Sequence, residues 1–309
     1  MVYTGILSQM AKEVQVVAVC DLNLQAAESM ASRWFSGARV YGHAFSLLEN
    51  EKPDGVIVLT TETSNAPIAK LALERGVHVY LEKPPATSCE VLADLIDTES
   101  KSTACVYTAF NRRHTPLFGK LDLPVSGIKR ITGLLSRKNR TIAGFPYTSV
   151  HLIDSAQFFA HSLFSNAEVS FENNGVSKWV LRGKLEAGVD CILTFIPDAE
   201  REQEYLKLET EEETWELFFP EADGVSPKVR AIRLRNGGLE REEFSDPGKN
   251  FLEMMGYAPC LREFFDRLRH GDLAGSNHRL SYCIQTTGIM ENMQKRPASC
   301  ANSLSVTKA

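Results

Sequence analysis

The feature that most constrains this fold is the alternation of short apolar runs with helical patterns over the first 120 residues. The apolar runs cover residues 14–20, 55–60, 77–81 and 104–110. The segments with apolar residues at helical spacing cover residues 24–35, 66–75 and 90–100. Strands that are apolar on both faces and are separated by helices need a parallel sheet covered on each side. We therefore predict a doubly wound α/β domain over residues 1–124.

The pattern changes after residue 124. A helical segment over residues 147–160 precedes strand-like runs at residues 167–172, 178–184, 189–195, 204–209, 214–219 and 229–235. The pairs Asn174-Gly175 and Gly237-Gly238 near their ends are hairpin signals. We predict an α+β domain over residues 125–294 with an open, mainly antiparallel sheet, and with late helices at 256–270 and 278–293 that pack back on the body. Residues 295–309 are expected to form a flexible tail.

The charge balance excludes several classes of function. Of the 309 residues, 34 are Lys or Arg and 39 are Asp or Glu, a net charge of −5. A mildly acidic chain without a basic run lacks the footprint of a nucleic-acid or membrane-surface binder. No apolar window is long enough to span a membrane, and no basic region precedes an apolar segment at the start, so we expect a cytoplasmic protein. The seven cysteines form no C-x-x-C pair, so no disulfide framework and no metal site is expected.

Asp21 follows the first apolar run directly. In a dinucleotide-binding fold, a carboxylate at this strand end accepts hydrogen bonds from the adenosine ribose and repels a 2′-phosphate. Asp21 therefore favours NAD(H) over NADP(H). The alternative is an ordinary turn or helix-start aspartate, which needs no ligand.

Two further polar groups follow strand-like runs of the first domain. Glu82 and Lys83 precede two prolines after the run at 77–81, and the segment 110–114 (FNRRH) closes the run at 104–110. Carboxyl ends of parallel strands line the ligand crevice, so both groups reach the same edge. A lysine at a strand end can instead be an ordinary solvated charge.

A fourth group lies on the helical segment 147–160. Tyr147 and His151 are four residues apart and Asp154 follows one turn later, so all three lie on one side of a helix. An isolated histidine there is commonly structural, but its neighbours make an acid/base role worth considering.

Together these segments resemble the Gfo/Idh/MocA family of nicotinamide-dependent oxidoreductases. Four landmarks carry the resemblance in the family's order: VVAVCDLN, the block ending in VHVYLEKPPA, FNRRHTPLF, and the HLID helix. The segment 110–118 and the later MMGYAPCLREFFDRL are most similar to the MviM, or virulence-factor-like, branch. The resemblance implies a Rossmann domain followed by an α/β domain whose open sheet often mediates homo-oligomers.

The resemblance also implies roles for individual residues. Lys83 would bind the substrate hydroxyl or carbonyl, and His151 would be the general acid/base with Tyr147 beside it. Arg112 and Asp154 would contact the small-molecule substrate. The residues expected beside the cofactor are Asp21, Thr60, Thr61, Asn65, Glu82, Lys83 and Asn111.

The sequence departs from the family pattern in two places. The family opens with a strand and a G-x-G-x-x-G turn that binds the pyrophosphate, and this chain contains no G-x-G. We expect a Rossmann domain truncated at its first strand, either because the start was assigned too late or because the chain is a degenerate relative. The second departure is Tyr147, where the family commonly has an aspartate. A phenol is a base only if a neighbour such as Lys83 lowers its pKa.

Two functions remain open on the sequence. The first is an NAD(P)-dependent oxidoreductase that transfers a hydride between nicotinamide and a sugar, a polyol or another small hydroxy or carbonyl compound. The second is a catalytically degenerate relative that acts as a binding or interaction protein without tight NAD binding.

Overall fold

The computed structural model describes residues 2–220, 228–245 and 250–303. The chain forms two compact units, and neither is one continuous segment. The first unit contains Met1–Ala86, Glu90–Ala109 and Tyr257–Ser281. The second contains Thr87–Cys89, Phe110–Gly256 and Tyr282–Ala309. No helix in the described ranges is long and apolar enough to cross a membrane.

These units differ from the expected ranges 1–124 and 125–294. The main difference is α8 (Tyr257–His270), which belongs to the first unit, where it contacts β4 (His78–Leu81). Its Phe264 is fully buried, and the ring lies 5.5 Å from that of Tyr80 on β4 and 5.8 Å from that of Tyr107. Burial of this aromatic face draws a late helix into the first unit.

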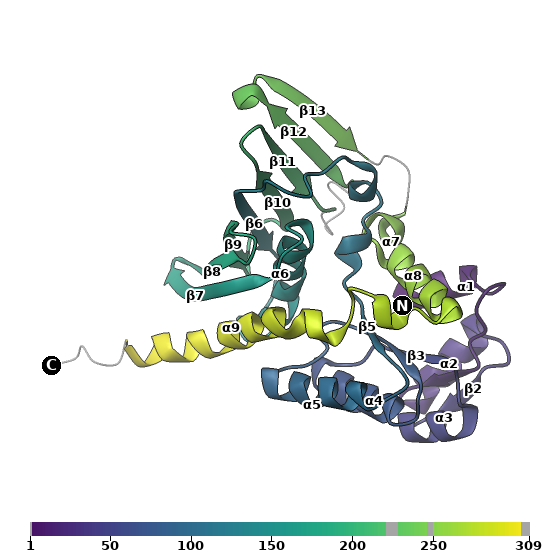
Figure 1. Cartoon of the computed structure of the whole chain (residues 1–309). Coiled ribbons are helices and arrows are strands. Elements are labelled where there is room, and N and C mark those ends of the chain that lie inside the picture. Colours follow the sequence, from purple (N-terminus) through teal and green to yellow (C-terminus); the bar gives the residue numbers. More distant parts are fainter. Residues whose placement is uncertain (1, 221–227, 246–249, 304–309) are drawn as a thin grey trace. The chain divides into compact units, whose positions relative to one another are not determined.

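The parallel strands of the first unit form two separate sheets. In one, β1 (Ala18–Cys20) pairs with β2 (Arg39–Tyr41). In the other, β3 (Gly55–Val58) and β5 (Val106–Thr108) flank β4. The helices of this unit, which surround the strands in Figure 1, also include α1 (Val2–Gln9), α2 (Leu24–Trp34), α3 (Ala44–Glu51), α4 (Glu62–Leu73) and α5 (Cys89–Ser100).

The parallel strands of the first unit differ in how far they are buried. Within the described part of the chain, β1 pairs only with β2, and β3 pairs only with β4. Most residues of β1 and β3 are half-buried, whereas β5 is buried throughout. Around β1, Val19 packs with Ala27 and Ala31 of α2 in a small core of their own. The doubly wound arrangement is therefore present, but it is divided.

The second unit is built on a sheet in the order β13-β12-β11-β10-β6-β9-β8-β7. All neighbours are antiparallel except β6 and β9, so the predicted open, mainly antiparallel sheet is confirmed. The strand bounds are β6 (Arg130–Ser136), β7 (Phe164–Asn174), β8 (Val176–Leu185), β9 (Asp190–Ile196), β10 (Gln203–Glu209), β11 (Glu213–Phe218), β12 (Arg230–Arg235) and β13 (Glu240–Ser245).

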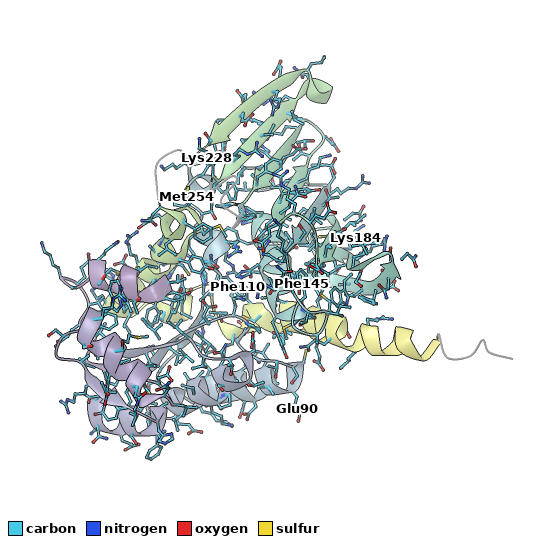
Figure 2. All side chains as sticks on the ribbon, turned by 180° about the vertical axis from the view of Figure 1, so that it is seen from behind. Glu90, Phe110, Phe145, Lys184, Lys228 and Met254 are labelled. Atoms are coloured by element: carbon cyan, nitrogen blue, oxygen red, sulfur yellow. The ribbon has the colours of Figure 1, made fainter. Side chains whose placement is uncertain are left out.

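Helix α6 (Pro146–Phe159) lies against β6, β9 and β10 (Figure 1). Strand β10 alternates buried and half-buried residues, which is typical of a sheet with one covered face. Figure 2 marks Phe145, which is fully buried just before α6, and Lys184 of β8, whose side chain is about half exposed.

Part of the segment expected as a flexible tail is helical. Helix α9 (Ile284–Ser303) contacts β7 and α6 and continues through residues 295–303. Trp179 of β8 anchors it, because the indole N–H donates to the carbonyl of Met293 at 3.0 Å. Residues 304–309, the rest of the expected tail, lie outside the described residues.

Candidate functional site

Lys83 lies in a turn at the carboxyl end of β4, in the first unit. Asn65 of α4 is 1% exposed, and its amide donates to the carbonyls of Glu82 at 3.1 Å and Pro84 at 3.2 Å. The Thr60 hydroxyl donates to the Asn65 carbonyl oxygen at 3.0 Å, which fixes the orientation of the amide. The structure thus brings four predicted residues, Thr60, Asn65, Glu82 and Lys83, into one hydrogen-bonded group.

Glu82 is hydrogen-bonded to two other segments of the same unit. Its Oε2 accepts the backbone N–H of Lys83 at 3.0 Å, and its Oε1 accepts the hydroxyl of Tyr3 at 2.6 Å. Its own N–H donates to the carbonyl of Val58, at the end of β3, at 3.0 Å. Sequence reasoning missed Tyr3, since nothing in the α1 sequence marks a residue that pairs 79 positions later.

Asp21 and Thr61 lie elsewhere in the first unit. Asp21 is exposed at the end of β1. Its Oδ1 accepts the N–H of Asn23 at 2.8 Å, and Oδ2 takes no part in this local bond. Thr61 precedes α4 and its hydroxyl lies 3.1 Å from that of Ser64. In the described part of the chain, the hydrogen bonds of both side chains are local and do not reach the Lys83 turn.

In the second unit, α6 carries Tyr147 and His151 one turn apart. Pro146 occupies the first turn, where a missing N–H costs nothing. The Ser149 hydroxyl donates to the carbonyl of Pro146 at 2.7 Å, and the Ser155 hydroxyl to that of His151 at 2.8 Å. His151 is 6% exposed and Tyr147 is half-buried. The helix therefore presents a sheltered imidazole with a phenol on the same side.

Asp154, the third residue of this group, is held by Arg113. Its Oδ2 accepts from Arg113 Nε at 2.9 Å, and Oδ1 pairs with the other end of the guanidinium. Burial raises the pKa of Asp154, and the adjacent Arg113 opposes that rise. The guanidinium also lies 4.9 Å from the ring of Phe110. This pairing favours a structural role for Asp154 over substrate binding.

Arg112 also forms an ion pair with a buried carboxylate. Its Nε and Nη2 donate to the two carboxylate oxygens of Glu204, each at 2.9 Å, and Arg137 pairs with the same carboxylate. Although burial raises the pKa of Glu204, the two guanidinium groups outweigh it and hold the value at about 2. Sequence reasoning missed Glu204, which is 92 residues from Arg112. Because Glu204 binds the Arg112 guanidinium through both oxygens, the pair favours a structural role for Arg112.

Asn111 is 1% exposed and belongs to the same buried region. Its amide donates to the carbonyl of Met255 at 2.7 Å, and its side-chain oxygen accepts from Arg112 at 3.2 Å. A Cβ on Gly256 would lie 2.0 Å from the Asn111 carbonyl oxygen, so only glycine fits there, with φ of +78°. Asn111 thus fixes the segment at Met255 and Gly256 within the second unit.

A nicotinamide dinucleotide fits part of this arrangement. An exposed carboxylate at the end of β1 suits a ribose, and the turn around Lys83 offers polar groups at the end of β4. The sequence contains no G-x-G, the glycine pattern of the turn that binds the pyrophosphate in such folds. The two ends of the cofactor thus have suitable residues here, and its phosphates do not.

Residues 2–110 match the family model GFO_IDH_MocA, described as an oxidoreductase family with an NAD-binding Rossmann fold. The chain is 25% identical over 282 residues to the inositol 2-dehydrogenase/D-chiro-inositol 3-dehydrogenase of Lacticaseibacillus casei, covering 85% of this chain and 79% of that protein.

Two solved structures show the same fold at 18% identity. The dehydrogenase (MviM) from Clostridium difficile has a TM-score of 0.77 and covers 94% of this chain and 93% of its own. The 3-ketoreductase KijD10 from Actinomadura kijaniata, solved with NADP, has a TM-score of 0.71 and covers 93% and 90%. Residues 2–110 thus match the Gfo/Idh/MocA oxidoreductase family, the similarity to the inositol dehydrogenase extends over most of the chain, and the two solved structures show the same fold.

Proposed function

We propose that this protein is an NAD(P)-dependent oxidoreductase that acts on a sugar, a polyol or a related small hydroxy or carbonyl compound. The observation that carries the proposal is the Lys83 turn, which Asn65 and Glu82 hold by hydrogen bonds at the carboxyl end of a parallel strand. So many bonds around one short turn favour a functional lysine over a solvated charge. The inositol dehydrogenase relative supports the substrate class.

In the proposed reaction, Lys83 donates a hydrogen bond to the substrate oxygen and stabilises negative charge on it. When bound, the nicotinamide supplies the hydride acceptor or donor. Asn65 and Glu82 keep the Lys83 backbone in place, so little reorganisation is needed when substrate binds.

His151 is proposed as the general acid/base that exchanges the proton of the substrate hydroxyl. A neutral imidazole is suited to this because its ordinary pKa lies near neutral pH. Tyr147, one turn earlier on α6, is the second polar group proposed to contact the substrate.

We propose NAD(H) over NADP(H) because of Asp21, whose exposed carboxylate would repel a 2′-phosphate. The KijD10 reductase, by contrast, was solved with NADP. We also propose a homo-oligomer formed through the sheet of the second unit.

The test is a fluorescence titration of the purified chain with NADH and NADPH, followed by turnover assays of Lys83→Ala. We expect binding in the micromolar range, and in Lys83→Ala a loss of turnover with NADH affinity largely kept. The control is Lys70→Ala, which removes an exposed lysine bound to Asp94 in the same unit. Full activity in Lys83→Ala would contradict the role of this lysine.

The divided sheet of the first unit favours a second candidate, a relative that binds a partner or ligand without tight NAD binding. The half-buried strands β1 and β3 and the absence of a G-x-G from the sequence support it. No response to NADH or NADPH up to millimolar concentration would favour this candidate.

A further inference from the structure

Tyr3 of α1 carries a hydroxyl that reaches the strand edge where Lys83 lies. Its side chain is buried at 6% exposure, with the ring edge-on to Tyr80 at 5.7 Å and to Tyr257 at 6.0 Å. The aromatic contacts fix the ring, and the hydroxyl then points to Glu82 Oε1 at 2.6 Å. A packed ring with a short bond to a carboxylate is a rigid anchor for that carboxylate.

The two oxygens of Glu82 have separate partners. Oε1 accepts from Tyr3, and Oε2 accepts the backbone N–H of Lys83 at 3.0 Å. Because both oxygens belong to one planar group, the bond to Tyr3 sets the direction in which Oε2 faces Lys83. Asn65 holds the carbonyls on either side of Lys83, and Glu82 accepts the amide N–H between them.

We propose that Tyr3 is a positioning residue for Lys83, which it orients through the carboxylate of Glu82. This rests on the proposed function, in which Lys83 binds the substrate oxygen. In this role Tyr3 acts on Lys83 through Glu82 and takes no part in the chemical step. It supplies a fixed hydrogen-bond donor from a helix that is remote in sequence from the turn.

The ionisation state of Tyr3 agrees with this role. Burial, together with the charge and the hydrogen bond of Glu82, raises the pKa of Tyr3 well above its ordinary value. The hydroxyl therefore keeps its proton and remains a donor at neutral pH. The Tyr80 hydroxyl lies 3.4 Å from that of Tyr3 and donates to the Cys260 sulfur, so it contributes no bond to Glu82.

Hydrogen exchange of the turn tests the proposal without any need for turnover. A peptide over residues 81–86 carries few exchanging amides, because residues 84 and 85 are prolines and have no N–H. Removing the anchor in Tyr3→Phe should speed exchange of the Lys83 amide about tenfold or more, because the carboxylate can then turn away from it.

The matched control is Tyr80→Phe, which removes a neighbouring buried hydroxyl and leaves the Tyr3–Glu82 bond in place. Its Lys83 amide should exchange as in the native chain. Equal acceleration in both variants, or acceleration spread evenly over α1 and β4, would mean that Tyr3 acts only through general stability, and would overturn the proposal. Unchanged exchange in Tyr3→Phe would overturn it as well.

A second variant tests whether the effect of Tyr3 on Lys83 passes through Glu82. Glu82→Gln keeps an oxygen that can accept from the Tyr3 hydroxyl. In place of Oε2 it puts an NH₂ group, which cannot accept the backbone N–H of Lys83. In that background, adding Tyr3→Phe should change exchange at Lys83 very little. Full acceleration by Tyr3→Phe in the Glu82→Gln background would show that Glu82 is not the intermediate, which overturns the proposal.

Kinetics give the functional arm, with myo-inositol and NAD⁺ as the probe pair. We expect Tyr3→Phe to lower kcat about tenfold with little change in the KM for NAD⁺, as misplacement of a substrate-binding group does. A native chain that does not turn over this pair counts against the proposed function for this substrate, and the exchange result then decides on Tyr3 alone. An active native chain with an unchanged kcat in Tyr3→Phe overturns the proposal.

Discussion

Glu204→Gln tests whether the buried ion pairs of the second unit carry stability. The native carboxylate is 4% exposed and accepts two bonds from Arg112, with Arg137 as its second cationic partner. A glutamine is nearly the same size but has no charge, so both guanidinium groups lose their counterion, and that of Arg112 is deeply buried. We expect the free energy of unfolding to fall because an uncompensated charge stays buried.

The size of the effect follows from the pKa of Glu204. The guanidinium groups hold it at about 2 against an ordinary value of 4.5. Each tenfold change in proton affinity is worth about 1.4 kcal/mol, so the folded state gains about 3 kcal/mol from ionising this group. Removing one partner of a buried pair costs about 3–5 kcal/mol in other proteins, which agrees.

The pH dependence has a definite sign. Because the folded-state pKa is lowered, the stabilisation is fully present above the unfolded value near 4.5, and it is lost as the pH falls toward about 2. The difference in the free energy of unfolding between the native protein and Glu204→Gln should therefore be constant at neutral pH and shrink between pH 4.5 and pH 2.

Urea unfolding followed by tryptophan fluorescence measures this difference. Two of the three tryptophans, Trp179 and Trp215, are buried in the second unit, so a Trp34→Phe background confines the signal to that unit. The control is Glu209→Gln on the same strand, whose pair with Lys207 at 2.8 Å is about one-third exposed and should contribute at most about 1 kcal/mol. Equal losses in the two variants would refute the reasoning.

Three further substitutions have defined outcomes. Asn65→Ala leaves two carbonyls of the Lys83 turn without their donor, and thermal unfolding should show a loss of about 1–3 kcal/mol; an unchanged melting temperature would contradict this. Asp21→Ala should reduce the ratio of NADH to NADPH affinity in fluorescence titrations, and a constant ratio would remove Asp21 from cofactor selection. Gly183→Ala places a Cβ 2.5 Å from the Asn166 carbonyl oxygen and should cost about 1–3 kcal/mol in urea unfolding, whereas Gly119→Ala, which meets open space, should cost far less.

Strands with long apolar runs were predictable and strands without them were not. The runs at 55–60 and 77–81 predicted β3 and β4, and the repeated alternation predicted β7 to β12 in the order of the chain. Three strands were missed. β2 has only three residues, β13 is an edge strand with four charged residues, and β6 contains a glycine within a mixed run. Such strands are specified by the neighbours they pair with, which a local pattern does not contain.

The sequence by itself determined the two kinds of sheet, the place of Lys83 after β4 and the position of Tyr147 and His151 one turn apart on one helix, because each depends on residues within one or two turns or strands. Only the tertiary structure decided that Glu204 neutralises Arg112, that Asp154 is held by Arg113, and that Tyr3 reaches Glu82. It also decided that the parallel strands divide into two sheets and that α8 joins the first unit. These features depend on side chains and backbone edges that meet across tens of residues, so their energies arise only when the whole chain is folded.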